Sequence, residues 1–96
     1  MSRPPEPAPY EVVIPGPVRR AIAEKLPQDV AWAVIEFISG PLARNPHRVG
    51  GELRGRLKGI HSAHLGAFRI QYVISDEDRT VTLRRVEHRS DIYGLP

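Results

Sequence analysis

The stretch that decides the fold lies in the second half of the chain and reads Phe68-Arg69-Ile70-Gln71-Tyr72-Val73-Ile74-Ser75, Asp76-Glu77-Asp78-Arg79, Thr80-Val81-Thr82-Leu83-Arg84-Arg85-Val86. Large apolar side chains alternate with other residues before the acidic segment, and again at positions 81 and 83 after it. A period of two is typical of a strand with one buried face. Two such strands joined by a short polar segment predict an antiparallel hairpin.

Two short helices are predicted upstream of this hairpin. Apolar residues recur at helical spacing over residues 18–26, and Pro27 ends that helix. A second helix begins at Gln28 or Asp29 and has a wide apolar face, up to a Ser-Gly-Pro break after Ile38. The tight proline connection between them predicts an αα-hairpin.

These elements predict one α+β domain over residues 10–96. Its small antiparallel sheet of about four strands has the two N-terminal helices packed on one face. A short strand is predicted at residues 10–14 and an irregular one at Leu57–Ala63, while the proline-rich residues 1–9 are predicted to be a flexible tail. The open face of the sheet is expected to carry Arg69 and Arg84. The expected core includes Trp32, Phe68, Ile70, Tyr72, Val81 and Leu83.

Composition excludes several classes of protein. The chain has 96 residues, 41% of them hydrophobic, and no cysteine, which excludes a disulfide framework, a thiolate zinc site and a cysteine nucleophile. No apolar run reaches the roughly 18 residues that a membrane span needs. The first nine residues have no apolar signal core, so we expect a cytoplasmic protein that does not act at a membrane.

Positive charge gathers in the second half of the chain. The net charge is +3, and residues 44–96 hold ten basic side chains, six acidic ones and all four histidines. This asymmetry indicates a polyanionic partner, most simply a nucleic acid. The alternative is a solvated basic face without a specific partner.

No metal site or cofactor motif stands out. His61 and His64 have helix-like spacing, but Gly59 and Gly66 disfavour a helix there, so we expect neither a metal nor a cofactor. The remaining functional groups are those of Arg, His, Lys and Tyr. RNA cleavage without a metal needs a base for the 2′-OH, fixed positive charge for the transition state and a proton for the departing 5′ oxygen. These residue types can provide all three.

Three segments together resemble the RelE/ParE toxin superfamily: Arg48-Val49-Gly50-x-x-Leu53-Arg54-Gly55, Gly66-x-Phe68-Arg69-Ile70-x-Tyr72 and Val86-x-His88-Arg89-x-Asp91-Ile92-Tyr93. The last is similar to the RelE branch in particular, and the resemblance covers residues 10–93. It implies an antiparallel sheet with two N-terminal helices. It also implies metal-free, ribosome-dependent cleavage of mRNA in the A site, with the ribose 2′-OH as nucleophile.

The resemblance also implies roles for single residues. It assigns catalytic roles to Arg69, His88 and Tyr93, and RNA- or phosphate-binding roles to Lys58, His61, His64 and Arg89. Arg84 is added to the RNA-binding residues because it is expected beside Arg69 on the open face. Arg69 resembles the phosphate-stabilising arginine, His88 a general acid or base, and Tyr93 the C-terminal tyrosine. Histidines stand at positions 61 and 64, where close relatives often have arginines.

Each of these residues also has a purely structural interpretation. Arg69 can be an ordinary surface arginine, His88 a cap on the last strand, and Tyr93 a ring packed over the sheet edge. Arg89 can form an ion pair with Glu87 or Asp91. His61 and His64 can be exposed loop residues, and Arg84 can contact an antitoxin or lie on a solvated strand edge.

Three functional hypotheses follow. The preferred one is a toxin that cleaves mRNA on the ribosome, and the second is a ParE-like toxin that binds DNA gyrase. The third is a weakly active or non-catalytic RNA-binding member. Under the first two, we expect an antitoxin partner whose acidic, disordered-to-helical segment covers the basic face.

Overall fold

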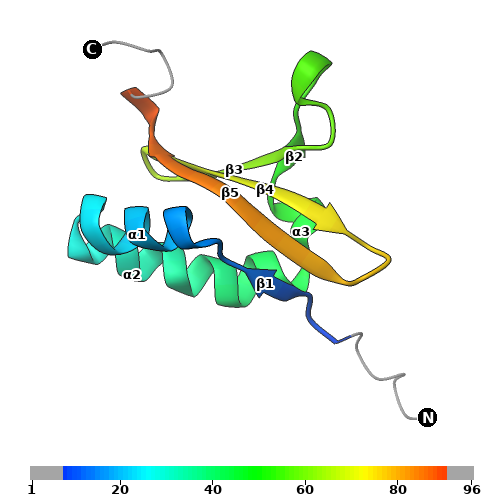
Figure 1. The fold of residues 1–96 in the computed structure, drawn as a ribbon, viewed down its shortest axis with the longest axis horizontal. Helices are drawn as coiled ribbons and strands as arrows, with labels where there is room; N and C mark the ends of the chain where they lie inside the picture. The colour runs from blue at the N-terminus through cyan, green and yellow to red at the C-terminus, as the bar shows by residue number, and fades with distance from the viewer. Residues whose placement is uncertain (1–7, 91–96) are drawn as a thin grey trace.

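The computed structural model describes residues 8–90, which form a five-stranded sheet in the order β1-β5-β4-β3-β2. Helices α1 and α2 lie together against one face of the sheet (Figure 1). This arrangement confirms the predicted α+β fold with two N-terminal helices on one side. The strands are β1 (Glu11–Val13), β2 (Gly51–Glu52), β3 (His61–Leu65), β4 (Phe68–Ser75) and β5 (Thr80–His88), and the helices are α1 (Gly16–Lys25), α2 (Gln28–Phe37) and α3 (Pro46–Val49).

Prolines set the limits of the two long helices. Pro15 and Pro27 directly precede α1 and α2, and Leu26 is extended because the residue before a proline disfavours helical geometry. The predicted break after Ile38 is instead a π-helical turn over Ile38–Leu42. Pro41 has no N–H to donate to the carbonyl four residues earlier. The helix therefore continues through this segment as a wider π-helical turn.

The sheet differs from the prediction in three respects. It has five strands, and β1 pairs with β5 in parallel, whereas the other three pairs are antiparallel. The strand predicted at Leu57–Ala63 lies instead at His61–Leu65. A 3₁₀ turn occupies Gly55–Leu57, and Gly59 has a φ of 93°, a left-handed conformation that delays the strand.

The core lies between α1, α2 and the inward face of β3, β4 and β5. Ile70, Tyr72, Val81 and Leu83 are fully buried as predicted, and Phe68 is half-buried. Trp32 was expected in the core and this was wrong, because its side chain is 59% exposed. It stands two residues, about 200° around the helix, from the buried Val34, and so lies on the opposite side of α2. The buried apolar residues packed together are Val18, Ile22, Val34, Ile38, Leu42, Ala63, Ile70, Tyr72, Val81 and Leu83.

Tyr72 connects the sheet to α3. Its hydroxyl donates a hydrogen bond to the Pro46 carbonyl at 2.7 Å, and the His61 ring stacks on its ring at 5.5 Å between centroids. Gly50 lies directly beside the same hydroxyl. A methyl group at Gly50 would stand 2.5 Å from Tyr72 Oη and 2.8 Å from the Ser62 carbonyl oxygen. Only a glycine fits there without displacing either group.

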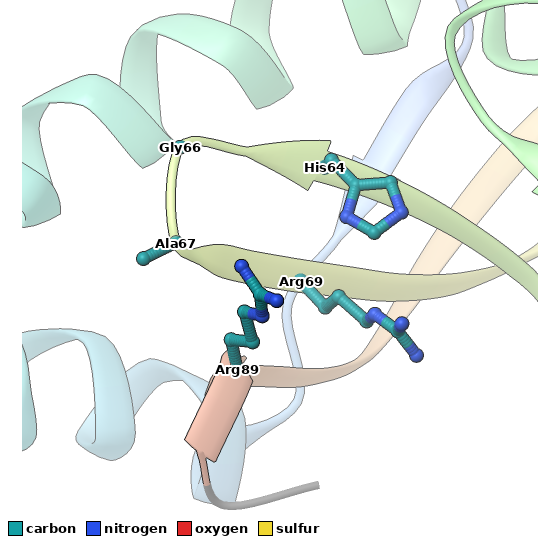
Figure 2. Close-up of a pocket in the computed structure, with 5 residues that line it drawn as sticks. All are labelled: His64, Gly66, Ala67, Arg69 and Arg89. Carbon is teal, nitrogen blue, oxygen red and sulfur yellow. The ribbon is translucent and has the colours of Figure 1, made fainter.

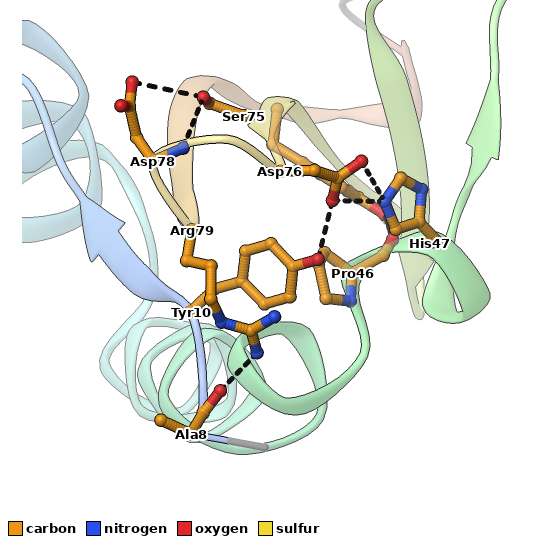
Figure 3. A network of polar contacts seen from close by, with 9 residues as sticks. Ala8, Tyr10, Pro46, His47, Ser75, Asp76, Asp78 and Arg79 are labelled. Atoms are coloured by element: carbon orange, nitrogen blue, oxygen red, sulfur yellow. Dashed lines mark hydrogen bonds and ion pairs between the residues drawn. The ribbon is translucent and has the colours of Figure 1, made fainter.

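A polar cluster holds the first strand and α3 against the β4–β5 turn (Figure 3). The hydroxyl of Tyr10 donates to Asp76 at 2.6 Å, and Nε2 of His47 lies 2.8 Å from the same carboxylate. Hydrogen bonds from Tyr10 and His47 lower the pKa of Asp76. Arg79 stacks 4.3 Å above the Tyr10 ring and donates to the Ala8 carbonyl. This cluster lies away from the open face of the sheet.

A Gly50→Ala substitution is expected to destabilise the protein by about 1–3 kcal/mol, the usual effect of overpacking a filled site. Gly51→Ala is the matched control, because no atom lies within 4 Å of a methyl group there. Urea unfolding of both variants measures the difference. Equal stabilities would contradict the close packing of Gly50 on Tyr72.

Alkaline pH is expected to destabilise the fold through Tyr72. Burial raises the pKa of Tyr72 to about 12 from an ordinary 10.0. A raised folded-state pKa gives stability that is complete below pH 10 and is lost as pH rises toward 12. The unfolding free energy should fall by about 2 kcal/mol across this window, and by less in Tyr72→Phe. Urea unfolding of both proteins at pH 9 and pH 11.5 tests this, and parallel losses would contradict it.

Candidate nucleic-acid interface

A row of charged side chains crosses the open face of the sheet. His64 on β3 pairs with Arg69 on β4, and Arg69 pairs on its other side with Glu87 on β5. Their neighbours Ala63, Ile70 and Val86 alternate with them and pack toward the helices. Because successive side chains in a strand project to opposite faces, the row His64, Arg69 and Glu87 projects away from the helices.

A cavity of about 260 Å³ opens beside this row (Figure 2). It is lined by His64, Gly66, Ala67, Arg69 and Arg89. His64 and Arg69 project into the same side from neighbouring strands, and Arg89 reaches it from the end of β5 (Figure 2). The backbone N–H of Arg89 donates to the Ala67 carbonyl at 2.7 Å, which fixes this residue beside the β3–β4 turn. The cavity brings together two guanidinium groups and an imidazole, a suitable set for a phosphate.

Arg69 is the best-placed anion ligand of the group. The residue is half-buried, and its Nε is buried with no hydrogen-bond partner among residues 8–90. A buried donor without an acceptor costs free energy, which an incoming anionic oxygen would recover. Arg69 also lies on β4, which has a paired strand on both sides, so its backbone is held rigidly.

Glu87 is the member of the charged row that sequence reasoning missed. It pairs with Arg69 in register but lines a separate cavity, together with Lys25 of α1. Its side chain is only 17% exposed, and its carboxylate lies 3.7 Å from Arg85 Nη1. The ion pair considered for it with Arg89 is therefore formed with Arg85 instead. Alternation puts residues 85 and 87 on the same face, which predicts their ion pair but not that this face is the open one.

The structure places His88 on the other side of the sheet from Arg69. His88 pairs with Phe68 in register, and the two rings meet edge to face at 5.0 Å. Its Nδ1 lies 2.7 Å from Ser90 Oγ. The predicted catalytic pair of Arg69 and His88 is therefore not brought together on one face. Tyr93, the third predicted catalytic residue, lies outside the described residues.

The other predicted RNA-binding residues are dispersed. His64 and Arg89 line the cavity with Arg69, whereas His61 faces the helix side and stacks on Tyr72. Lys58 is exposed on the arm of residues 51–60, which extends from the sheet on the side away from the helices (Figure 1). Arg84 was expected beside Arg69, but it is the extra residue of a β-bulge, since Gln71 pairs with Arg85 and Tyr72 with Leu83. It lines a shallow cavity against α1 instead.

Comparison with known proteins identifies the family. A family model described as the ParE toxin of the type II toxin–antitoxin system parDE matches residues 18–93. The chain belongs to the RelE/ParE toxin family. This RelE/ParE toxin is 47% identical over 85 residues to Toxin RelG of Mycobacterium tuberculosis, covering 88% of the chain and 97% of the relative. It is 41% identical over 87 residues to Toxin RelE of the same organism, covering 91% and 89%.

Solved structures agree with this assignment. The toxin–antitoxin complex RelBE2 of Mycobacterium tuberculosis contains a chain that is 46% identical, with a TM-score of 0.80, over 84% of this toxin and 99% of that chain. The isolated Escherichia coli toxin RelE is 19% identical, with a TM-score of 0.67 over 88% and 92%, and shows the likeness of fold alone. Within residues 8–90 there is no group of three or more potential metal ligands, and no helix long and apolar enough to cross a membrane.

Substitution of the central arginine should weaken RNA binding. Arg69→Ala is expected to lower the affinity for a single-stranded oligonucleotide and to reduce the slope of log affinity against log salt by about 0.7, the value for one lost phosphate contact. Arg20→Ala, an exposed arginine on α1, is the control. Fluorescence anisotropy with a cleavage-resistant 2′-deoxy oligonucleotide at several salt concentrations measures both quantities. Equal slopes for the two variants would exclude a phosphate contact by Arg69.

Proposed function

We propose that this toxin is a metal-independent endoribonuclease that cleaves mRNA in the ribosomal A site and so inhibits translation. The single observation that carries the proposal is the cavity on the open face, which Arg69, Arg89 and His64 line together. Fixed cations at one point on a rigid sheet can stabilise the extra negative charge of a phosphorane-like transition state. The relatives named RelE and RelG support the RelE branch.

Arg69 is the phosphate-stabilising residue in this proposal, and Arg89 adds a second contact. His64 lies beside them, and the exposed Lys58 on the projecting arm would contact RNA further along the nucleotide strand. Tyr93 keeps the role that the family resemblance implies, to stack on a base or position the phosphate. His88, packed against Phe68, can affect the end of β5 but lies across the sheet from Arg69.

A cognate antitoxin is the second expected partner. Two of the similar solved structures are complexes, RelBE2 of Mycobacterium tuberculosis and the RelE–RelB complex of Pyrococcus horikoshii. An acidic antitoxin segment would be complementary to the open face and would exclude RNA from it. Arg84 and Arg85, exposed at the edge of β5 beside α1, are available to the same partner.

Expression of the toxin alone is expected to arrest growth and to produce mRNA 5′ ends inside translated codons. Arg69→Ala should abolish both, since the phosphorane would lose its main source of positive charge, whereas Arg20→Ala should not. Mapping of 5′ ends against ribosome positions provides the measurement. An absence of arrest and of cuts would favour the non-catalytic RNA-binding alternative.

A second candidate is a toxin that binds DNA gyrase. It is supported by the family model, whose description names the ParE toxin and whose match spans most of the chain. Growth arrest with intact mRNA, together with loss of supercoiling when purified toxin is added to gyrase, would establish this function in place of RNA cleavage.

A further inference from the structure

The open face carries one carboxylate, and its other ionisable side chains are arginines and a histidine. Among the described strand residues that project from this face of β3, β4 and β5, the acid is Glu87. A carboxylate repels a phosphate, so Glu87 cannot be a phosphate ligand on this face. Glu87 is also mostly buried, with 17% of its side chain exposed, so its carboxylate is held in place rather than free in solvent.

Glu87 and His64 flank Arg69 from the two neighbouring strands. The register puts His64 opposite Arg69 on one side and Glu87 opposite it on the other. Directly opposed residues of antiparallel strands have Cα atoms about 4.5–5.5 Å apart, so the histidine and the acid are separated by roughly 10 Å with the arginine between them. In an in-line displacement at phosphorus, the attacking and departing oxygens lie on opposite sides of the phosphorus atom. Glu87 and His64 likewise lie on opposite sides of Arg69, so each could act on one of the two oxygens.

We propose that Glu87 and His64 carry out the two proton transfers of RNA cleavage, on opposite sides of a phosphate bound by Arg69. This inference rests on the proposed endoribonuclease function. The Glu87 carboxylate removes the proton from the ribose 2′-OH while the 2′ oxygen forms a bond to phosphorus. The bond from phosphorus to the 5′ oxygen breaks, and the His64 imidazolium gives its proton to that oxygen. The products are a 2′,3′-cyclic phosphate and a 5′-OH, with Glu87 protonated and His64 neutral until solvent restores them.

The charged residues around Glu87 and His64 can be compared with their proposed roles in proton transfer. Glu87 is paired with Arg69 of β4 and lies 3.7 Å from Arg85 of β5, and Lys25 of α1 lines a second cavity together with Glu87. An ionised carboxylate is the form that accepts a proton. His64 is faced by Arg69 and by Arg89 at the end of β5, and Glu36 of α2 lines an adjoining cavity. An imidazole can donate a proton near neutral pH and recover it from solvent, to which His64 is exposed.

The first test uses ribosomes programmed with an mRNA in the A site and measures single-turnover cleavage from pH 4.5 to pH 9. Glu87→Gln and His64→Gln are each expected to slow cleavage by roughly 100-fold or more, the usual contribution of general acid–base catalysis. Glu87→Gln should remove the fall in rate at low pH, and His64→Gln the fall at high pH. Glu77→Gln and His47→Gln, which lie in the β4–β5 turn and on α3, are the matched controls and should keep the wild-type rate and profile.

The second test separates the two roles. A substrate with sulfur in place of the departing 5′ oxygen needs no proton on its leaving group. His64→Gln should cleave this substrate at nearly the wild-type rate, whereas Glu87→Gln should remain slow. Thermal unfolding of both variants, and their binding of the 2′-deoxy oligonucleotide, show whether each is folded with its open face intact.

The outcomes distinguish this inference from the proposed function. If the wild-type protein cleaves nothing, or Arg69→Ala cleaves as well as wild type, the proposed function fails first. If wild type cleaves and Arg69→Ala does not, but folded Glu87→Gln and His64→Gln keep the wild-type rate and pH profile, the assignment of these two residues is overturned. A rescue by the sulfur leaving group in Glu87→Gln rather than His64→Gln would also overturn it.

Discussion

The pairing of β4 with β5 is the constraint on which the rest of the structure depends. Its register decides at once which side chains enter the core and which form the open face, because side chains alternate along a strand. Tyr72 and Leu83 meet on the inward side, and Arg69 and Glu87 on the outward side. A slip of one residue would bury Arg69 and expose Tyr72. The core and the candidate site are thus two sides of a single pairing.

The remaining elements hold this pair in place from both ends. Near the β4–β5 turn, Asp76 accepts hydrogen bonds from Tyr10 and His47, which brings β1 and α3 to the same point. At the other end, the Arg89 backbone bonds to Ala67 and so keeps the end of β5 beside the β3–β4 turn. The cavity lies at this second end. The cluster around Asp76 therefore holds the fold together at the end opposite the cavity.

The features that could be predicted from sequence are those with a clear period or a chain-breaking residue. Alternation over residues 68–75 identified β4, and Pro15 and Pro27 marked the beginnings of α1 and α2. The parallel pairing of β1 could not be predicted, because alternation indicates a strand but not the direction in which it pairs. Strand β2 could not be predicted because two residues are too few to show a period. Trp32 was misplaced because the apolar face of α2 is wide and its sequence does not show which part meets the sheet.

The candidate site was predicted in part, for a related reason. Arg69 was identified as a candidate, and His64 and Arg89 were expected near RNA. Residue type and local alternation are enough to select these three residues. The arrangement of partners around Arg69 depends on register, and register beyond position 83 depends on the bulge at Arg84. Straight alternation from Leu83 would have given Glu87 the inward direction and His88 the outward one. One inserted residue reverses these two directions, and it leaves no recognisable pattern in the sequence.

The bulge has a further consequence for solubility. β1 covers β5 only along Thr80–Thr82, and among the described strands none pairs with β5 on that side beyond this point. An open strand edge is a template on which other chains can aggregate. Here the edge bends at Arg84, carries two adjacent exposed arginines and has α1 alongside it. The same bulge that directs Glu87 to the open face thus also protects a vulnerable edge from self-association.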